Sequence, residues 1–210
     1  MIDPLGMAGG RMSADGPDLN DVPPILVLGV GNPLMRDEGV GPRTVEFMLE
    51  GFEFPETVEI IDAGTMGYMI LDLLRGRQRL LIIDAMKDTG HEPGTVLLLS
   101  AEDIAPNTVL HSMHDLRVVD VLQAGALMGI EVETLCVGVQ IESIEEWVTE
   151  LSDPVQAAIP MAASVAFEVL LEWGIEPTPR EGDSADAQII RAMRTYEPIG
   201  QPEEPADQPD

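Results

Sequence analysis

The stretch "ILVLGVGNPLMRDEGVGPR", residues 25–43, decides the fold of this chain. Its first six residues form a nearly continuous apolar run, which is typical of a strand that is buried on both faces. Glycines then mark a turn that carries two carboxylates, Asp37 and Glu38. From Gly39 onward the apolar residues take a helical spacing. A buried strand that leads through a glycine-rich turn into a helix is the opening unit of an α/β fold.

The same alternation continues along the chain. Four further apolar runs predict strands at residues 58–62, 79–85, 95–99 and 133–139. Helical spacing predicts helices at residues 39–50, 66–75, 113–128 and 154–173. The order is βαβαβ, then a hairpin-like excursion, a helix, a last strand and a closing helix. We therefore expect one domain of the three-layer α/β/α class, with a mostly parallel, twisted sheet of about five strands.

The closing helix carries its own start signals. Ser152 or Asp153 can cap it, and Pro154 can occupy its first turn. Pro160 lies inside the predicted helix and is expected to kink or split it. Outside the core domain, which we place at residues 25–176, the segments 1–24 and 177–210 are rich in Pro, Asp, Glu and Gly. We expect both to be disordered tails.

The chain of 210 residues is strongly acidic, with a formal net charge of -27, and about -19 of this charge lies within residues 25–176. Such a surface repels phosphate backbones and anionic membranes, so neither nucleic acid nor a membrane is an expected partner. A metal cation or a basic protein segment suits it better. The single cysteine, Cys136, excludes an internal disulfide and a cysteine-rich metal site. With no secretion signal or membrane span evident, we expect a cytoplasmic monomer.

Carboxylates stand at the ends of three predicted strands. Asp37 and Glu38 follow the first strand, Asp62 ends the second and Asp84 ends the third. In open α/β sheets, ligands bind at the carboxyl ends of the strands. Burying several carboxylates there requires a cation, a basic residue or a shared proton. Because only 11 residues are Lys or Arg, a metal ion is the simplest partner for Glu38 and Asp84.

A nitrogen ligand for this ion can come from His91, His111 or His114. His114 is preferred, because "SMHDLRVVDVLQAG" (112–125) is typical of a helix start with Ser112 as its cap. Three ligands with open positions describe a site that binds something exchangeable. Asp37 is interpreted as the N-cap of the first helix, and Asp62 as a turn-forming acceptor.

Other functions are disfavoured by particular residues. "GVGNPL" (29–34) begins like a dinucleotide loop, but Leu34 replaces the third glycine and the nearby acids repel a pyrophosphate. Cys136 lies within a predicted strand and is interpreted as a buried, inert thiol. Met66 and Met69 have helical spacing that indicates packing.

Several motifs together resemble those of the nickel-iron hydrogenase maturation endopeptidases, from about Ile25 to Trp173. They are "LGVGNPLMRDEGVG" (28–41), "DAGTMG" (62–67), "IIDAMK" (82–87), "PGTVLLL" (93–99), "SMHDLRVVDVL" (112–122) and "VGVQIES" (137–143). The resemblance implies a protease that removes the C-terminal extension of a hydrogenase large-subunit precursor once nickel is in place. It also implies that Glu38, Asp84 and His114 are the metal ligands and the catalytic residues.

The resemblance further implies that the ion is nickel, presented by the substrate, and that zinc or cadmium can occupy the same site. Two alternatives remain open on the sequence. One is a non-catalytic chaperone that holds or checks nickel with the same three residues. The other is a peptidase or phosphorylase of similar architecture that acts on small molecules and has a deep, closing pocket.

Overall fold

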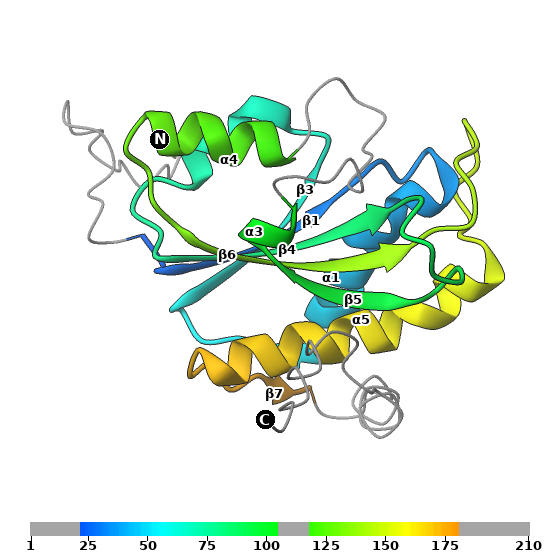
Figure 1. Cartoon of the computed structure of the whole chain (residues 1–210). Coiled ribbons are helices and arrows are strands. Elements are labelled where there is room, and N and C mark those ends of the chain that lie inside the picture. Colours follow the sequence, from blue (N-terminus) through cyan, green and yellow to red (C-terminus); the bar gives the residue numbers. More distant parts are fainter. Residues whose placement is uncertain (1–21, 105–117, 181–210) are drawn as a thin grey trace, which may run out of the picture.

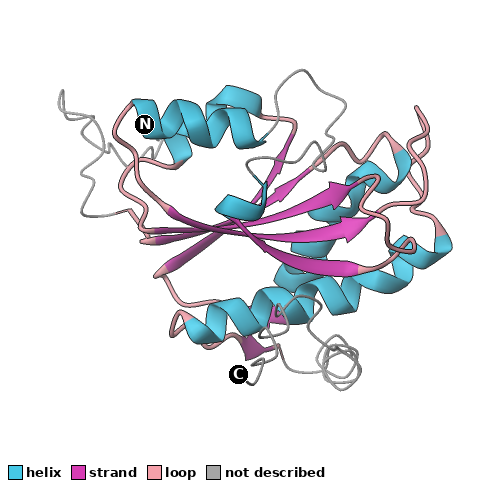
Figure 2. Cartoon of the chain, in the orientation of Figure 1, coloured by secondary structure: helices cyan, strands magenta, loops and turns pink. Residues whose placement is uncertain are grey.

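The computed structural model of the protein describes residues 22–104 and 118–180. A five-stranded sheet crosses its centre, in the order β3-β1-β4-β6-β5 (Figures 1 and 2). The strands are β1 (Ile25–Val30), β3 (Val58–Gly64), β4 (Arg79–Met86), β5 (Val96–Ser100) and β6 (Glu133–Gln140). All neighbours pair in parallel except β5, which runs antiparallel to β6. The predicted α/β class and mostly parallel sheet are confirmed.

Helices cover both faces of this sheet (Figure 1). One face carries α1 (Val40–Gly51) and α5 (Asp153–Glu172), and the other carries α2 (Ile70–Leu73) and α4 (Val118–Leu127). Short helices, η2 (Arg36–Gly39), η3 (Gly67–Met69) and α3 (Ala101–Ile104), lie in the connections. Alternate residues of the strands belong to two apolar clusters, one between the sheet and each layer of helices. Along β4, for example, Leu81 and Ile83 face α1 and α5, whereas Leu80 and Ile82 face α2 and α4.

Two features of the strands differ from the prediction. The segment 95–99 does not form a hairpin with the strand before it, because β6 lies between β4 and β5 in the sheet. A second, two-stranded sheet joins β2 (Phe52–Glu53) to β7 (Thr178–Pro179) in antiparallel pairing. The described fold therefore continues to Arg180, whose backbone N–H donates to Gly51 at 2.9 Å.

The closing helix does not split at Pro160. α5 is one helix of 20 residues that starts after Ser152, with Pro154 in its first turn. Its apolar residues pack against the sheet and against α1, and this tertiary packing offsets the hydrogen bond that Pro160 cannot donate. In the part of the chain that the structure describes, α5 is the one helix with the length and composition of a membrane span. About 61% of that span is buried within the fold, as in the core helix of a globular domain.

Candidate metal and catalytic site

Residues 31–39, which connect β1 to α1, are called the first loop, and glycines bring this loop close to the sheet. Gly31 has a φ of +131°, and a Cβ there would lie 1.9 Å from the carbonyl oxygen of Glu38. A Cβ on Gly41 would lie 2.2 Å from the carbonyl oxygen of Val30 and 2.4 Å from that of Ile83. The first turn of α1 therefore rests directly on the ends of β1 and β4. This close approach holds η2, with its two carboxylates, at the carboxyl edge of the sheet.

Glu38 and Asp84 come together at this edge. Glu38 lies in η2 and is 0% exposed, and Asp84 lies near the end of β4 and is 1% exposed. The Asp84 Oδ1 atom accepts a hydrogen bond from the N–H of Ala85 at 2.8 Å. Its Oδ2 atom is buried and has no hydrogen-bond partner among the described residues. A buried carboxyl oxygen in this state can bind a proton or a cation.

The electrostatics of Asp84 follow from these surroundings. Burial raises the pKa of the Asp84 carboxyl from 3.8 to about 8. The hydrogen bond from Ala85 lowers this pKa, and the nearby charge of Glu38 raises it. Two carboxyl groups that interact in an apolar interior favour an added positive charge between them. The two carboxyl groups therefore have the oxygen donors that a divalent ion prefers.

The third predicted ligand, His114, lies outside the described residues, as do His111 and Ser112. Within residues 22–104 and 118–180, no three His, Cys, Asp or Glu side chains form a metal-binding group. The segment that contains His114 directly precedes α4. Side chains alternate between the two faces of a strand, so Asp84 shares a face of β4 with Leu80 and Ile82. This is the face of the sheet that α4 covers. The roles of Glu38, Asp84 and His114 stay predictions.

The role assigned to Asp37 was wrong. Neither η2 nor α1 has a side-chain cap, and α1 begins after Gly39. The buried carboxylate of Asp37 instead reaches the segment between β6 and α5. It accepts bonds from the N–H groups of Glu142 (3.1 Å), Ser143 (3.0 Å) and Ser152 (2.6 Å), and from the Ser152 hydroxyl (2.9 Å). The Ser152 side chain therefore binds Asp37 and makes no capping bond to α5.

We call residues 142–152 the strap, because this segment crosses the first loop. Met35 forms a parallel bridge with Val148. Arg36 donates its backbone N–H to Val148 at 2.7 Å, and its guanidinium binds Glu145 at 2.7 Å. No pattern in the sequence predicts this contact. The strap has no regular secondary structure, and its partners on the first loop lie more than 100 residues away.

The structure also tests the interpretations of other residues that were singled out in the sequence. Asp62 is exposed and accepts the N–H of Gly64 at 2.9 Å, which confirms its role in the turn. Cys136 is fully buried, and burial together with the charge of Asp84 raises the pKa of its thiol. Met66 packs against the core, as predicted, but Met69 is 66% exposed. His91 lies in an exposed loop.

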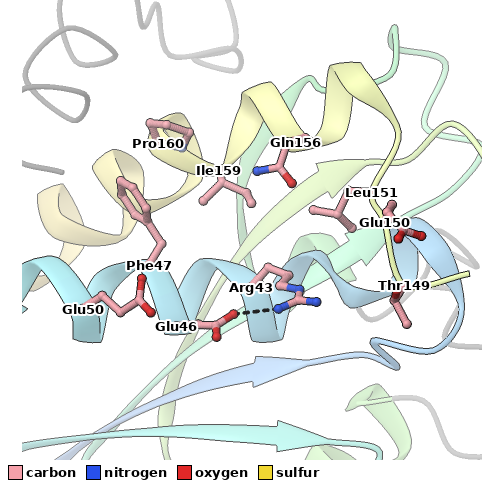
Figure 3. Close-up of a pocket in the computed structure, with 10 residues that line it drawn as sticks. All are labelled: Arg43, Glu46, Phe47, Glu50, Thr149, Glu150, Leu151, Gln156, Ile159 and Pro160. Carbon is pink, nitrogen blue, oxygen red and sulfur yellow. Dashed lines mark hydrogen bonds and ion pairs between the residues drawn. The ribbon is translucent and has the colours of Figure 1, made fainter. Parts of the chain in front are cut away.

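Two open grooves run along the exposed side of α1. Figure 3 shows one of them, between α1 and α5, with a volume of about 470 Å³. The side chains of Phe47 and Ile159 face it, and Arg43 forms an ion pair with Glu46 at 2.9 Å. The second groove, of about 590 Å³, extends from α1 to Leu34 in the first loop. Neither groove is lined by Glu38 or Asp84.

Comparison with known protein families shows to which family the chain belongs. A family model described as hydrogenase maturation protease matches residues 42–169, which is more than half of the chain. The chain belongs to the hydrogenase maturation protease family. It is therefore an endopeptidase, which confirms the resemblance stated on the motifs and disfavours the non-catalytic alternative.

Relatives support this membership over most of their length. The chain is 40% identical to the hydrogenase 2 maturation protease of Escherichia coli (strain K12), covering 75% of this chain and 96% of that protein. It is 35% identical to the hydrogenase expression/formation protein HupD of Rhizobium leguminosarum bv. viciae, covering 88% and 92%. Among solved structures, the hydrogenase maturating endopeptidase HybD from E. coli matches with a TM-score of 0.68 at 35% identity. That match covers 76% of this chain and 99% of HybD.

Proposed function

We propose that this endopeptidase removes the C-terminal extension of a nickel-iron hydrogenase large-subunit precursor after nickel has been inserted. The observation that supports this most is the buried Asp84 carboxyl, which lies within electrostatic reach of Glu38 and has an Oδ2 atom without a hydrogen-bond partner among the described residues. A site of this kind favours a cation over a neutral substrate group. Such a requirement would make cleavage depend on the metal.

The ligands that we propose are Glu38, Asp84 and His114. Their oxygen and nitrogen atoms suit nickel and also zinc or cadmium. His114 stands four residues before α4, which covers the face of the sheet to which Asp84 belongs. The nickel is part of the substrate, and when bound it would supply a Lewis acid for peptide hydrolysis. Glu38 and Asp84 orient the precursor by holding its ion at the carboxyl edge of the sheet.

A direct attack by water suits the site better than an acyl-enzyme. The Cys136 thiol is fully buried and its pKa is raised, so it cannot supply a thiolate to a substrate. We further propose that the protein acts as a cytoplasmic monomer, in keeping with its single cysteine. Its net charge of -27 disfavours nucleic acid and anionic membranes as partners.

A cleavage assay tests this function. Purified protein is mixed with nickel-loaded and with nickel-free precursor, and the products are weighed by mass spectrometry. We expect only the nickel-loaded precursor to lose its extension. Glu38→Gln, Asp84→Asn and His114→Ala should each slow cleavage by at least about 100-fold, whereas the exposed control Glu56→Gln should not.

The possible outcomes separate the parts of the proposal. A precursor of unchanged mass after incubation with the wild-type protein would overturn the proposed cleavage. Processing of nickel-free precursor at the full rate would overturn the metal requirement. Wild-type rates in the His114→Ala variant would remove His114 from the site.

A further inference from the structure

The strap and the first loop present two large apolar side chains to solvent at one place. Trp147 is 81% exposed and Leu34 is 47% exposed. They are joined through the backbone, because the N–H of Trp147 donates to the carbonyl oxygen of Leu34 at 2.8 Å. Leu34 lies in the turn that leads to η2 and Glu38. This apolar pair therefore stands beside the loop that carries the candidate site.

The backbone at this place is held in an unfavourable conformation. Trp147 has a φ of +65° and Arg36 has a φ of +50°, a region that side chains other than glycine seldom occupy. For a bulky side chain this conformation costs about 1–2 kcal/mol. The bonds of the strap to Asp37 and Arg36 hold it in place. Strain that keeps an aromatic side chain exposed is typical of a binding surface.

The charge around Trp147 is negative. The strap contains four glutamates and no lysine or arginine; the glutamates are Glu142, Glu145, Glu146 and Glu150. Arg36 is bound to Glu145. Among the described residues, neither Glu146 nor Glu150 has an ion-pair partner, and both are exposed. Next to an exposed indole, this arrangement favours a cationic side chain, which gains both ion-pair and cation–π contacts.

We propose that Leu34 and Trp147 form a docking surface for a positively charged, apolar segment of the large-subunit precursor. The inference rests on the proposed function, because it assigns a recognition surface to the same reaction. The groove of about 590 Å³ is lined by Leu34, Thr149 and the exposed side of α1. It holds three carboxylates, Glu46, Glu50 and Asp62, against one cation, Arg43, which is paired with Glu46. A bound segment can therefore extend from the apolar pair into an acidic groove.

The same charges argue against other occupants. A second copy of this chain would bring four more strap glutamates to the surface, and like charges in contact oppose association. Nucleic acid would meet the same repulsion. A basic segment of a protein substrate is the occupant with complementary charge. Tryptophan is also among the residues that contribute most to binding at protein interfaces.

Binding of the precursor to Trp147→Ala tests the docking surface. Association is measured by calorimetry with nickel-free precursor, which the proposed function leaves intact, so that the parent is the wild-type protein and Glu38 is kept in every variant. Trp147→Ala should weaken binding by at least about tenfold, and Leu34→Ala by a smaller factor. The matched control is Leu127→Ala, which removes a 91% exposed apolar side chain at the opposite end of the sheet. This control should bind as the parent does.

Trp147→Gly separates recognition from a structural role. Because Gly adopts a positive φ without strain, this variant should keep its Tm or raise it by about 2–4 °C. It should nevertheless lose as much precursor affinity as Trp147→Ala. A residue that only supports the fold would not combine unchanged stability with lost binding.

The charge requirement has its own test. Glu146→Lys together with Glu150→Lys should weaken association and reduce its dependence on NaCl, whereas Glu56→Lys, at the amino end of the sheet, should change neither. The inference is overturned if the parent shows no association, if Trp147→Ala binds as tightly as the parent, or if the charge reversal has no effect. A dimer that Trp147→Ala dissociates would also overturn it, because the occupant is then a second copy. The proposed function fails independently, when wild-type protein leaves the precursor mass unchanged.

Discussion

At the scale of single residues, the neighbours Asp37 and Glu38 show how differently two buried carboxylates can be used. Both are 0% exposed. Asp37 is satisfied by four hydrogen bonds from the strap, so it needs no further partner. Glu38 instead interacts with Asp84, whose pKa it raises. Asp37 is therefore a positioning residue that fixes the strap against the loop, whereas Glu38 lies within electrostatic reach of Asp84.

Replacing Asp37 should cost much of the stability of the fold. Asp37→Ala leaves three backbone N–H groups without their acceptor, and the free energy of unfolding should fall by about 3 kcal/mol or more. Asp37→Asn keeps one of the two oxygen acceptors and should lose less. The control is Asp62→Ala, which removes an exposed acceptor of one N–H and should cost less than about 1 kcal/mol. Urea denaturation measures all three, and equal losses for Asp37→Ala and Asp62→Ala would contradict the assigned role.

The sequence could predict Glu38 and Asp84 because the signal for each is local. Asp84 stands near the end of a continuous apolar run, and Glu38 lies in the glycine-marked turn that follows another such run, so both are placed at the carboxyl edge of the sheet. The partner of Asp37 could not be predicted in this way, because Ser152 lies 115 residues further along the chain. The exposed Trp147 was missed for the same reason, since its backbone partner is Leu34.

At the scale of elements, the five strands of the main sheet and the described helix ends were predicted within two residues, whereas the start of the helix predicted at 113–128 lies outside the described residues. Long apolar runs mark buried strands regardless of their partners. The helix predicted at 66–75 is shorter, being η3 followed by α2. The pairing of β2 with β7 was not predicted, because a strand of two residues is too short to show a pattern of apolar residues. Pro160 was expected to kink or split α5, and the helix remains continuous because its apolar residues are buried against the sheet.

The close packing of α1 against the sheet depends on Gly41. Gly41→Ala would place a Cβ 2.2 Å from the carbonyl oxygen of Val30 and 2.4 Å from that of Ile83, so α1 has to move. We expect a loss of about 1–3 kcal/mol in the free energy of unfolding. The control is Gly125→Ala in α4, where the nearest atom would lie 3.5 Å away, an ordinary contact. This change should stabilise the protein by up to about 1 kcal/mol, because alanine favours a helix.

Urea denaturation compares these two glycine variants. Opposite signs of their effects support a close contact between helix and sheet at Gly41. A Gly41→Ala protein as stable as the parent would show that α1 need not lie so near the ends of β1 and β4. In that case the loop with Glu38 would not be fixed by this contact.

At the scale of the whole molecule, stability should depend on pH because the fold buries Asp84 in an already acidic protein. The pKa of its carboxyl is 3.8 in an unperturbed chain and about 8 in the fold. Between these values the folded protein holds a proton that the unfolded chain has released. Burial of Asp84 therefore costs little below about pH 4, and its cost grows as the pH rises to about 8.

Asp84→Asn isolates this contribution from the other carboxylates. The variant cannot ionise at position 84, so its stability relative to the wild type should increase from pH 4 to pH 8 by up to about 1.4 kcal/mol per pH unit. Above about pH 8 the difference should become constant. Urea denaturation of metal-free protein in a chelator measures it, with Asp72→Asn, whose side chain is 84% exposed, as the control. A difference between wild type and Asp84→Asn that stays constant from pH 4 to pH 8 would show that Asp84 is not held neutral in the fold. The sheet edge would then carry a charged carboxylate before any cation binds, and no proton would have to leave Asp84 when an ion enters the site.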